Sequence, residues 1–203
     1  MHVMGRMWAA AAALVLVAGC TGHKPDDGDY VAKMAEARAS KDADFQKESD
    51  PIPPSRKAEF LPLAYFAIDP GYNVPASLAP SDDQTVIPMP TSTGAIRRMR
   101  RAGTLSFALK GQPMTLAALV DLSDQNLNHL FVPFTDLTSG TETYPAGRYL
   151  DLYRNGTGLY EIDFNRAYQP YCYYNASYEC PYPPAENRLK IPVRAGERMK
   201  AHK

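Results

Sequence analysis

Apolar and polar residues alternate most clearly in the middle of the chain. Leu105, Phe107 and Leu109 alternate with small or polar residues, and the same period of two continues through residues 114–122 and 130–134. A period of two places successive side chains on opposite faces of a strand, so that one face can pack on a core. Short turn-forming segments separate the three runs. We therefore predict an antiparallel meander in this region.

A hairpin is indicated around Asn155-Gly156, a dipeptide typical of tight turns between strands. A two-residue loop would put leucines and carboxylates on one face, whereas a three-residue loop over residues 155–157 separates them. We therefore predict that the apolar face of the hairpin carries Leu150, Leu152, Tyr160, Ile162 and Phe164. In this register Asp151 lies opposite Glu161, and this repulsion has to be relieved by a nearby cation or by solvent.

The pattern has a helical period in the region that precedes the strands. Asp29 can cap a helix over residues 30–48, in which Val31, Met34 and Phe45 form a thin apolar stripe. Charged residues cover the remaining surface, which is typical of a solvated face. We therefore predict one surface helix with few apolar contacts.

Residues 51–90 hold nine of the eighteen prolines together with several aromatic residues, so we expect extended, packed connections with short strands. Residues 85–89 fit an edge strand, because prolines are excluded from central strands. The four arginines in 97–101 fit an exposed edge strand that charge protects from aggregation, or a contact with anionic lipid or polysaccharide.

These elements together predict the fold class. We expect a mainly β protein, an antiparallel and partly closed barrel or sandwich with one N-terminal helix. A single domain over residues 29–203 is predicted, with its β region at 85–197, because about 200 residues suffice for one core and a tail.

The first residues have the features of an export signal. Arg6 precedes an apolar run of about eleven residues, too short to span a bilayer, which ends at Cys20. The ending Leu16-Val17-Ala18-Gly19-Cys20 resembles a bacterial lipobox, which implies that residues 1–19 are removed and Cys20 is acylated, for example with palmitate. An ordinary secretory signal with an incidental cysteine is the alternative. Residues 20–28 then form a tether, and Thr21 implies the periplasmic face of the outer membrane in a bacterium with two membranes.

Charge balance and the absence of known motifs leave several function classes without support. The chain has 22 basic and 22 acidic residues, so nothing favours nucleic-acid binding. A glycine-rich phosphate loop and a helical metalloprotease motif are both absent from the sequence. We expect no cofactor, and the sequence does not predict an oligomeric state.

The last third of the chain carries the candidate chemistry, because ten of the thirteen tyrosines lie between Tyr144 and Tyr182, among alternating carboxylates and guanidinium groups. Charges near apolar surface must be paired, so we predict that one pocket or groove collects these groups. The candidate residues are Glu142, Arg148, Asp163, Asn165, Tyr168, Tyr171, Glu186, Asn187, Arg188, Arg194 and Glu197. The carboxylates can supply a general acid and base, or they can brace loops by pairing with arginines.

Several short motifs in this region resemble a bacterial family of domains of unknown function, family 1684. The matching stretches include Ala146-Gly147-Arg148-Tyr149-Leu150, Asp163-Phe164-Asn165-Arg166-Ala167-Tyr168, Cys180-Pro181-Tyr182-Pro183-Pro184 and Arg194-Ala195-Gly196-Glu197. The resemblance covers about residues 30–197, with departures at Gln169, Tyr173 and Tyr182. It implies no activity, so no catalytic residue can be transferred.

Cys172 and Cys180 lie close together in an exported chain, which favours a disulfide. Two free thiols are an alternative. A zinc site is disfavoured because His129 is the only histidine between residues 29 and 197, and we therefore predict no metal site. His129 itself fits a surface position.

We therefore expect a cell-envelope lipoprotein of unknown activity, a ligand-binding or structural module attached to the membrane by its lipid. The tyrosines suit a sugar or peptide ligand, and they suit the packing of an irregular loop equally well. The alternative function is a hydrolase that uses a carboxylate pair of the last third.

Lipidation at Cys20 can be tested directly. Mass spectrometry of the mature N-terminus should show an acylated Cys20, and Cys20→Ala should move the protein from the membrane to the soluble fraction. A mature protein that begins beyond position 20 would contradict this prediction.

Overall fold

The structure is a computed structural model that describes residues 27–82, 85–123 and 127–200. The predicted signal peptide, Cys20 and most of the predicted tether lie outside the described residues. In the described part of the chain, no helix is long and apolar enough to cross a membrane.

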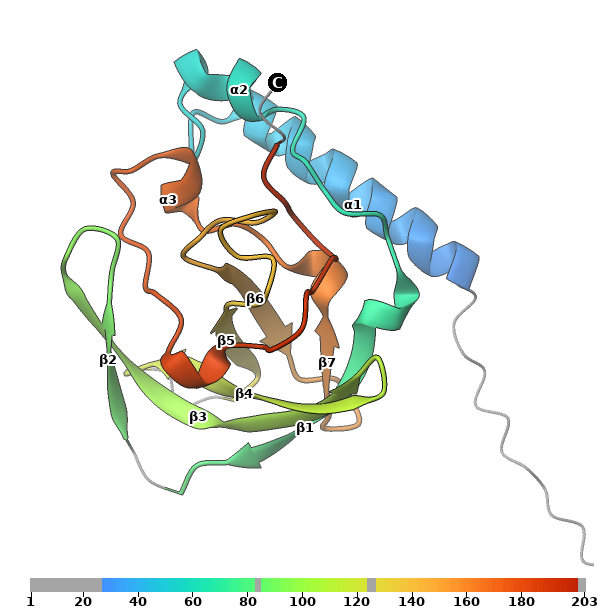
Figure 1. Cartoon of the computed structure of the whole chain (residues 1–203), viewed down its shortest axis with the longest axis vertical. Coiled ribbons are helices and arrows are strands. Elements are labelled where there is room, and N and C mark those ends of the chain that lie inside the picture. Colours follow the sequence, from blue (N-terminus) through green and yellow to red (C-terminus); the bar gives the residue numbers. More distant parts are fainter. Residues whose placement is uncertain (1–26, 83–84, 124–126, 201–203) are drawn as a thin grey trace, which may run out of the picture.

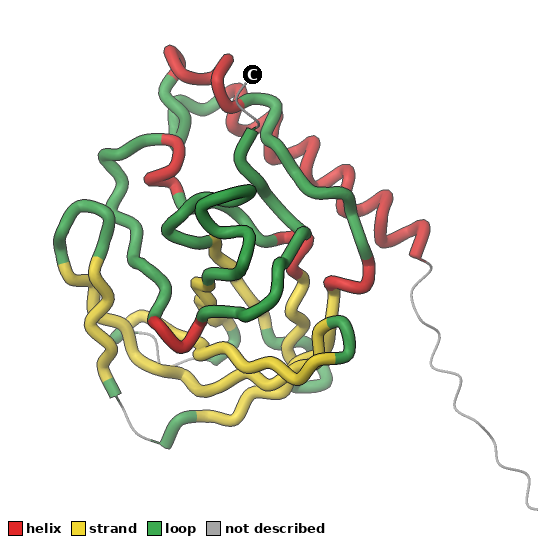
Figure 2. Tube along the Cα trace, viewed as in Figure 1, coloured by secondary structure: helices red, strands yellow, loops and turns green. Residues whose placement is uncertain are grey.

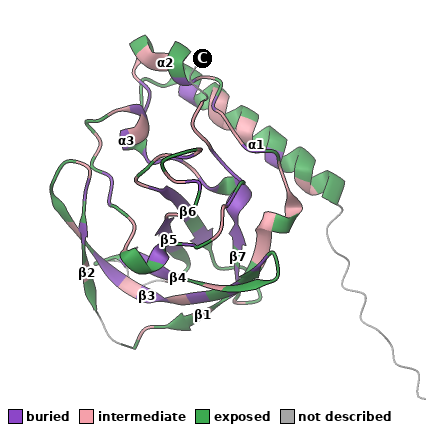
Figure 3. Ribbon diagram, in the orientation of Figure 1, coloured by how far each residue is buried: buried purple, intermediate pink, exposed green. Residues whose placement is uncertain are grey.

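The predicted N-terminal helix is confirmed as α1 (Asp27–Lys47). Met34 and Phe45 are its buried residues, and most of its surface is exposed (Figure 3). Polar side chains add to this thin apolar contact: Arg38 donates to the carbonyl of Phe66 at 2.9 Å. The helix lies along one side of the β domain, next to the last described residues of the chain (Figure 1).

Seven antiparallel strands form one curved sheet that is nearly closed into a barrel (Figures 1 and 2). The sheet order is β6-β5-β4-β3-β1-β7, with β2 paired to the far part of β3. The strands are β1 (Asn73–Pro80), β2 (Val86–Pro90), β3 (Ile96–Leu109), β4 (Gln112–Asp121), β5 (His129–Phe134), β6 (Arg148–Tyr153) and β7 (Tyr160–Asp163). We call the gap between the end strands β6 and β7 the seam.

The predicted fold class, the meander β3-β4-β5 and the edge strand β2 are confirmed. Strand β1 lies before the predicted start of the β region at residue 85, and its prolines hid it from the sequence pattern. Gly103 shows why glycine is needed where β1 meets β3, since a Cβ there would lie 2.3 Å from the carbonyl oxygen of Ala79.

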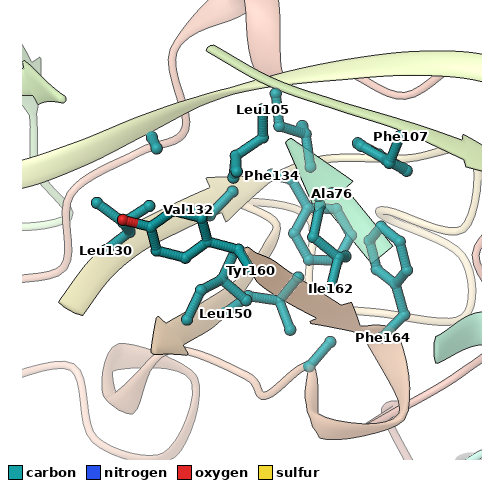
Figure 4. Close-up of a cluster of buried hydrophobic side chains, with 14 of the residues drawn as sticks. Ala76, Leu105, Phe107, Leu130, Val132, Phe134, Leu150, Tyr160, Ile162 and Phe164 are labelled. Carbon is teal, nitrogen blue, oxygen red and sulfur yellow. The ribbon is translucent and has the colours of Figure 1, made fainter. Parts of the chain in front are cut away.

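The core fills the inside of the sheet, where side chains from β6 and β7 meet those of the meander (Figure 4). Phe134 and Phe164 pack edge to face with their ring centroids 5.4 Å apart. The predicted apolar face of the last two strands is confirmed, because all of its members are buried, namely Leu150, Leu152, Tyr160, Ile162 and Phe164.

The predicted pairing of these two strands is wrong. β6 pairs with β5, and β7 pairs with β1, so Asp151 does not lie opposite Glu161. A hydrogen bond from the Asn155 N–H to the Leu159 carbonyl, 2.9 Å, starts a hairpin that does not continue. Continuing it would set Asp151 opposite Asp163, and like charges in cross-strand positions destabilise a pair.

Short helical turns fill the connections between these elements. They are η1 (Pro54–Arg56), α2 (Lys57–Phe60), η2 (Pro70–Tyr72), η3 (Phe164–Arg166), α3 (Tyr171–Tyr174) and η4 (Ala185–Asn187). A second, smaller core joins α1 to α2 and α3 through Phe45, Phe60 and Tyr174. The rings of Phe60 and Tyr174 pack edge to face at 5.2 Å.

Arg148 is fully buried at the start of β6, as its predicted orientation toward the core required. Its guanidinium binds the carboxylate of Asp136 at 2.9 Å and the carbonyls of Val193 at 2.7 Å, Glu197 at 3.1 Å and Ala195. Burial lowers the pKa of Arg148, and the Asp136 carboxylate opposes that shift. This one side chain therefore ties the C-terminal segment to the sheet.

Replacing Arg148 with Met should lower the free energy of unfolding by about 3–5 kcal/mol, because it leaves Asp136 buried without its counter-charge. Chemical denaturation measures the loss. The double variant Arg148→Met/Asp136→Leu should recover much of it. Arg194→Met removes an exposed ion pair with Glu142 and should leave stability nearly unchanged. Equal losses for Arg148→Met and Arg194→Met would contradict the prediction.

Candidate functional site

The candidate residues from the sequence divide among several contacts in the described part of the chain: Tyr168 and Tyr171 line one cavity, whereas Asn165 and Glu197 line another. Arg148 is held by Asp136, Asp163 by Tyr30, and Glu186 by Arg101 on the surface. Asp136 was not among the candidates, because nothing in the sequence placed it near β6. The separate partners mean that these charged groups mostly join segments of the chain to one another.

Glu142 and Arg194 form an ion pair of 2.8 Å on the surface. Arg188 is exposed, and its backbone makes an isolated bridge to Thr135. Asn187 is buried and binds backbone groups of two strands, including the N–H of Ala117 at 2.7 Å. Asn187 therefore braces β4 and β5, and the pair of Glu142 and Arg194 joins the loop after β5 to the C-terminal segment.

Asp163 and Asn165 connect the end of β7 to α1. The hydroxyl of Tyr30 donates to Asp163 Oδ1 at 2.8 Å, and the Asn165 side-chain amide donates to the Tyr30 oxygen at 2.9 Å. Arg166 also reaches Asp163, at 3.3 Å. Burial raises the pKa of the Tyr30 hydroxyl, which keeps it protonated and able to donate to the carboxylate.

Glu197 is buried and anchors the middle of α1. Its carboxylate accepts from Lys41 Nζ at 2.6 Å, from the Tyr174 hydroxyl at 2.9 Å and from the Gln169 N–H at 2.7 Å. Three partners satisfy one buried charge, so Glu197 acts as a structural anchor. The same Lys41 ammonium also lies 5.1 Å from the centre of the Tyr168 ring.

A groove of about 420 Å³ opens beside that ring, and we call it the Tyr168 groove. Side chains from β5, β6, α1, β3 and the loop around α3 form its walls. It is lined by Lys41, Arg97, Phe131, Tyr149, Asp151, Tyr168, Tyr171, Tyr178, Glu179, Cys180 and Pro181. Tyr168 and Tyr171 are the candidates from the sequence that line it.

The aromatic walls of the groove are held by their own contacts. The backbones of Tyr149 and Tyr168 exchange two hydrogen bonds of 2.9 and 3.1 Å. The Tyr149 ring packs edge to face on Phe131, at 4.8 Å, and on Tyr168, at 5.8 Å. Tyr171 packs in the same way on Tyr178, at 5.3 Å. Burial raises the pKa of Tyr149 and Tyr168, so both hydroxyls stay protonated.

Asp151 is the central polar group of this region. Its carboxylate accepts from the Tyr168 hydroxyl at 2.7 Å and lies 3.0 Å from His129 Nε2. The imidazole of His129 stacks on Tyr153 at 4.9 Å, so the predicted surface histidine has two specific partners. Asp151 and Tyr168 also line a second cleft of about 560 Å³ at the seam.

The disulfide predicted between Cys172 and Cys180 is wrong for this structure, because both thiols are free. The Cys172 N–H, near the start of α3, donates to the Cys180 sulfur at 3.1 Å. The Cys180 thiol, then Ser92 and Tyr144, hydrogen-bond to the Cys172 sulfur and lower its pKa to about 6. The same contact raises the pKa of Cys180. Both cysteines belong to one buried cluster with Tyr149, and Cys180 lines the groove.

Metal ligands are not grouped in the described part of the chain. No set of three or more histidine, cysteine, aspartate or glutamate side chains there is placed to hold an ion.

Apart from Tyr168 and Tyr171, the groove residues were not among the binding candidates from the sequence. These are Lys41, Arg97, Phe131, Tyr149, Asp151, Tyr178, Glu179, Cys180 and Pro181. Lys41 is on the helix surface that the charge pattern marked as solvated, and Arg97 is in an arginine run that fits an edge strand. Only tertiary packing brings them to the tyrosines. A partial signal was present for Glu179, which stands directly before a motif cysteine.

The fold and the groove define a class of small, nearly closed antiparallel β-sheet domain with one N-terminal helix and a tyrosine-lined surface groove. The chain belongs to the family described as "Protein of unknown function (DUF1684)", which matches residues 58–198. The family resemblance of the sequence motifs is thereby confirmed. Every groove residue except Lys41 lies within the matched range.

A solved structure supports the same assignment. The chain is similar to an uncharacterised protein from gene locus rrnAC0354 of Haloarcula marismortui, whose solution NMR structure shares 35% sequence identity and a TM-score of 0.66. The similarity covers 85% of this chain and 96% of that chain. No curated protein matches this chain.

The thiol pair can be tested by titration. Absorbance at 240 nm should report a thiolate that forms with a midpoint near pH 6 and that disappears in Cys172→Ser. Cys180→Ala removes the thiol donor, so the midpoint should rise toward about 8.5, the value of an unperturbed cysteine. A midpoint above 8 in the unmodified protein would contradict the assignment.

Proposed function

We propose that the protein binds a neutral, sugar-like ligand in the Tyr168 groove. The observation that carries this proposal is the lining of the groove, in which four tyrosines and one phenylalanine surround polar groups of both signs. Aromatic rings stack on the apolar faces of sugars, while hydroxyl, carboxylate and ammonium groups bind their hydroxyls.

Charge supports a neutral ligand. Lys41 and Arg97 contribute two positive charges, and Asp151 and Glu179 contribute two negative charges, so the lining has no net charge. The volume of about 420 Å³ is within the range of small-molecule sites. The O–H groups of Tyr149 and Tyr168 are already donated to the Pro181 carbonyl and to Asp151, so these two hydroxyl oxygens can accept hydrogen bonds from a ligand. Asp151 can accept as well, because a carboxylate has more lone pairs than its two partners use.

The walls of the groove are preorganised. Lys41 is fixed by Glu197, Tyr149 donates to the carbonyl of Pro181 at 2.7 Å, and Tyr168 is fixed by backbone pairing to β6. Side chains that are already ordered lose little conformational entropy when a ligand binds. The same ion pairs that brace the fold therefore also support binding.

We further propose that a lipid on Cys20 holds the protein in the cell envelope. The charged start, the short apolar run and the ending at Cys20 support this location. Helix α1 begins at Asp27, so only six residues separate it from the acylated cysteine. The groove would therefore be held close to the membrane surface.

One observation favours a hydrolase as the second candidate. Asp151 and Glu179 both line the groove, and in the described part of the chain neither forms an ion pair with arginine or lysine. Two such carboxylates can serve as acid and base in glycoside hydrolysis. Hydrolysis of a bound oligosaccharide that is lost in both Asp151→Asn and Glu179→Gln would establish this function, and binding without turnover would exclude it.

The binding proposal can be tested with neutral oligosaccharides, namely cellotetraose, maltotetraose and chitotetraose. NMR titration should shift groove amides for at least one of them. Tyr171→Ala should weaken that binding by about two- to tenfold, because it removes one aromatic contact worth ~0.5–1.5 kcal/mol. Tyr182→Ala is the matched control, since Tyr182 is similarly exposed but lies outside the groove. No shift at 10 mM oligosaccharide would contradict the proposal.

A further inference from the structure

The seam between β6 and β7 is a second cleft, and two strand edges border it. It has a volume of about 560 Å³. Its lining residues are Tyr30, Asn73, Asp151, Leu152, Tyr153, Glu161, Asp163, Arg166 and Tyr168. Leu150 and Ile162 point from β6 and β7 into the shared core (Figure 4), so the two strands meet through their apolar face while their edges stay apart.

The hydrogen bonds of Tyr149 show which backbone groups of β6 point toward β5 and which point into the seam. The N–H and carbonyl of Tyr149 bind Tyr168, on the side away from β5, and the residue opposite it in β5 is Pro133, which has no N–H to donate. Backbone groups alternate in direction along a strand. The backbone groups of Asp151 and Tyr153 therefore also point away from β5, into the seam.

The same reasoning applies to β7. Glu161 lies opposite Pro75 in β1, and proline cannot donate a ladder hydrogen bond. The pair Pro75–Glu161 is therefore a non-hydrogen-bonded pair, and the backbone groups of Glu161 point away from β1. Asp163 is two residues from Glu161 on the same strand, so its backbone groups point the same way. Both residues therefore direct N–H and carbonyl groups toward β6.

Hydrogen bonds within the chain close the seam at both of its ends. Among the described residues, backbone hydrogen bonds outside the regular ladders close it at Tyr149–Tyr168 and at Asn155–Leu159. Asp151 and Tyr153 lie between these two closures, and β6 and β7 are the two ends of the sheet order among the described strands, so no ladder pairs them with each other. The middle of the seam therefore presents an open edge that has the geometry of a β-strand.

This edge lacks the protection that the chain gives to its other exposed strand. In β2, Pro88 and Pro90 interrupt the edge, and exposed Arg98 lies across from Pro88 on β3. Prolines and positive charges at an edge prevent pairing with other chains. The seam strands have neither proline nor lysine, and at their edge Tyr153 exposes 68% of its surface.

We propose that the seam binds an extended peptide with positively charged side chains, which adds as a strand to the edge of β6. Asp151, Glu161 and Asp163 outnumber the single cation Arg166 in the lining, and the seam therefore carries two excess negative charges. Main-chain hydrogen bonds supply affinity in this mode of recognition, and side chains of the edge supply selectivity. About four residues of extended peptide, at ~3.3 Å each, span the open edge.

The test is an NMR titration of the full chain with acetyl-Lys-Val-Lys-Val-Lys amide, up to millimolar concentration. The amides of Asp151, Tyr153, Glu161 and Asp163 should shift. The same peptide with every amide N-methylated should not bind, since it has no donors for the edge. The matched acidic peptide, with Glu in place of Lys, should bind more weakly. Glu161→Gln should raise the Kd for the basic peptide about two- to fivefold.

Glu48→Gln is the matched control, because Glu48 is exposed beyond the end of α1 and outside the seam, so it should leave the Kd unchanged. Three results would overturn the proposal: no shift of the seam amides, equal binding of the N-methylated peptide, or equal binding of the acidic peptide. The proposal does not depend on the sugar-like ligand, since oligosaccharide and peptide are titrated separately.

Discussion

The buried guanidinium of Arg148 is the interaction on which the rest of the structure depends. It stands at the first position of β6 and binds Asp136 together with three carbonyls of residues 193–197. The C-terminal segment forms no strand of the sheet, so its carbonyls need donors from another part of the chain. Arg148 supplies them, and in doing so it places Glu197 where its side chain can bind Lys41 of α1. The sheet, the C-terminal segment and the helix are thereby joined through one charged network.

That network explains why a region rich in ionisable groups contains few free ones. Glu197 and Asp163 attach α1 through Lys41 and Tyr30, and the helix in turn supplies walls for both clefts. The side chains that attach the helix therefore also position the walls of both clefts. Asp151 differs from these carboxylates, because its partners are a tyrosine hydroxyl and a histidine that lie at the border of the two clefts.

The seam shows how a locally favourable hairpin can give way to a tertiary alternative. Asn155-Gly156 favours a tight turn, and the first hydrogen bond of a hairpin does form, between Asn155 and Leu159. Beyond it, Tyr168 occupies the edge of Tyr149, while β5 and β1 pair with the outer sides of both strands. Closing the hairpin would also bring Asp151 against Asp163. The sheet closes through side-chain packing in the core, and the strand edges stay open.

The helix, the meander, the apolar faces of β6 and β7 and the burial of Arg148 could all be predicted from the sequence, because periodicity reports which side chains face a core. The sequence also marked the tyrosine-rich region. The strand pairing could not be predicted in this way, because the same apolar face is compatible with several neighbours. Charge partners were equally undetermined: Asp136 lies 12 residues from Arg148 in the sequence, whereas Lys41 lies 156 residues from Glu197. Ion pairs form by distance in space, and a single sequence contains no record of that distance.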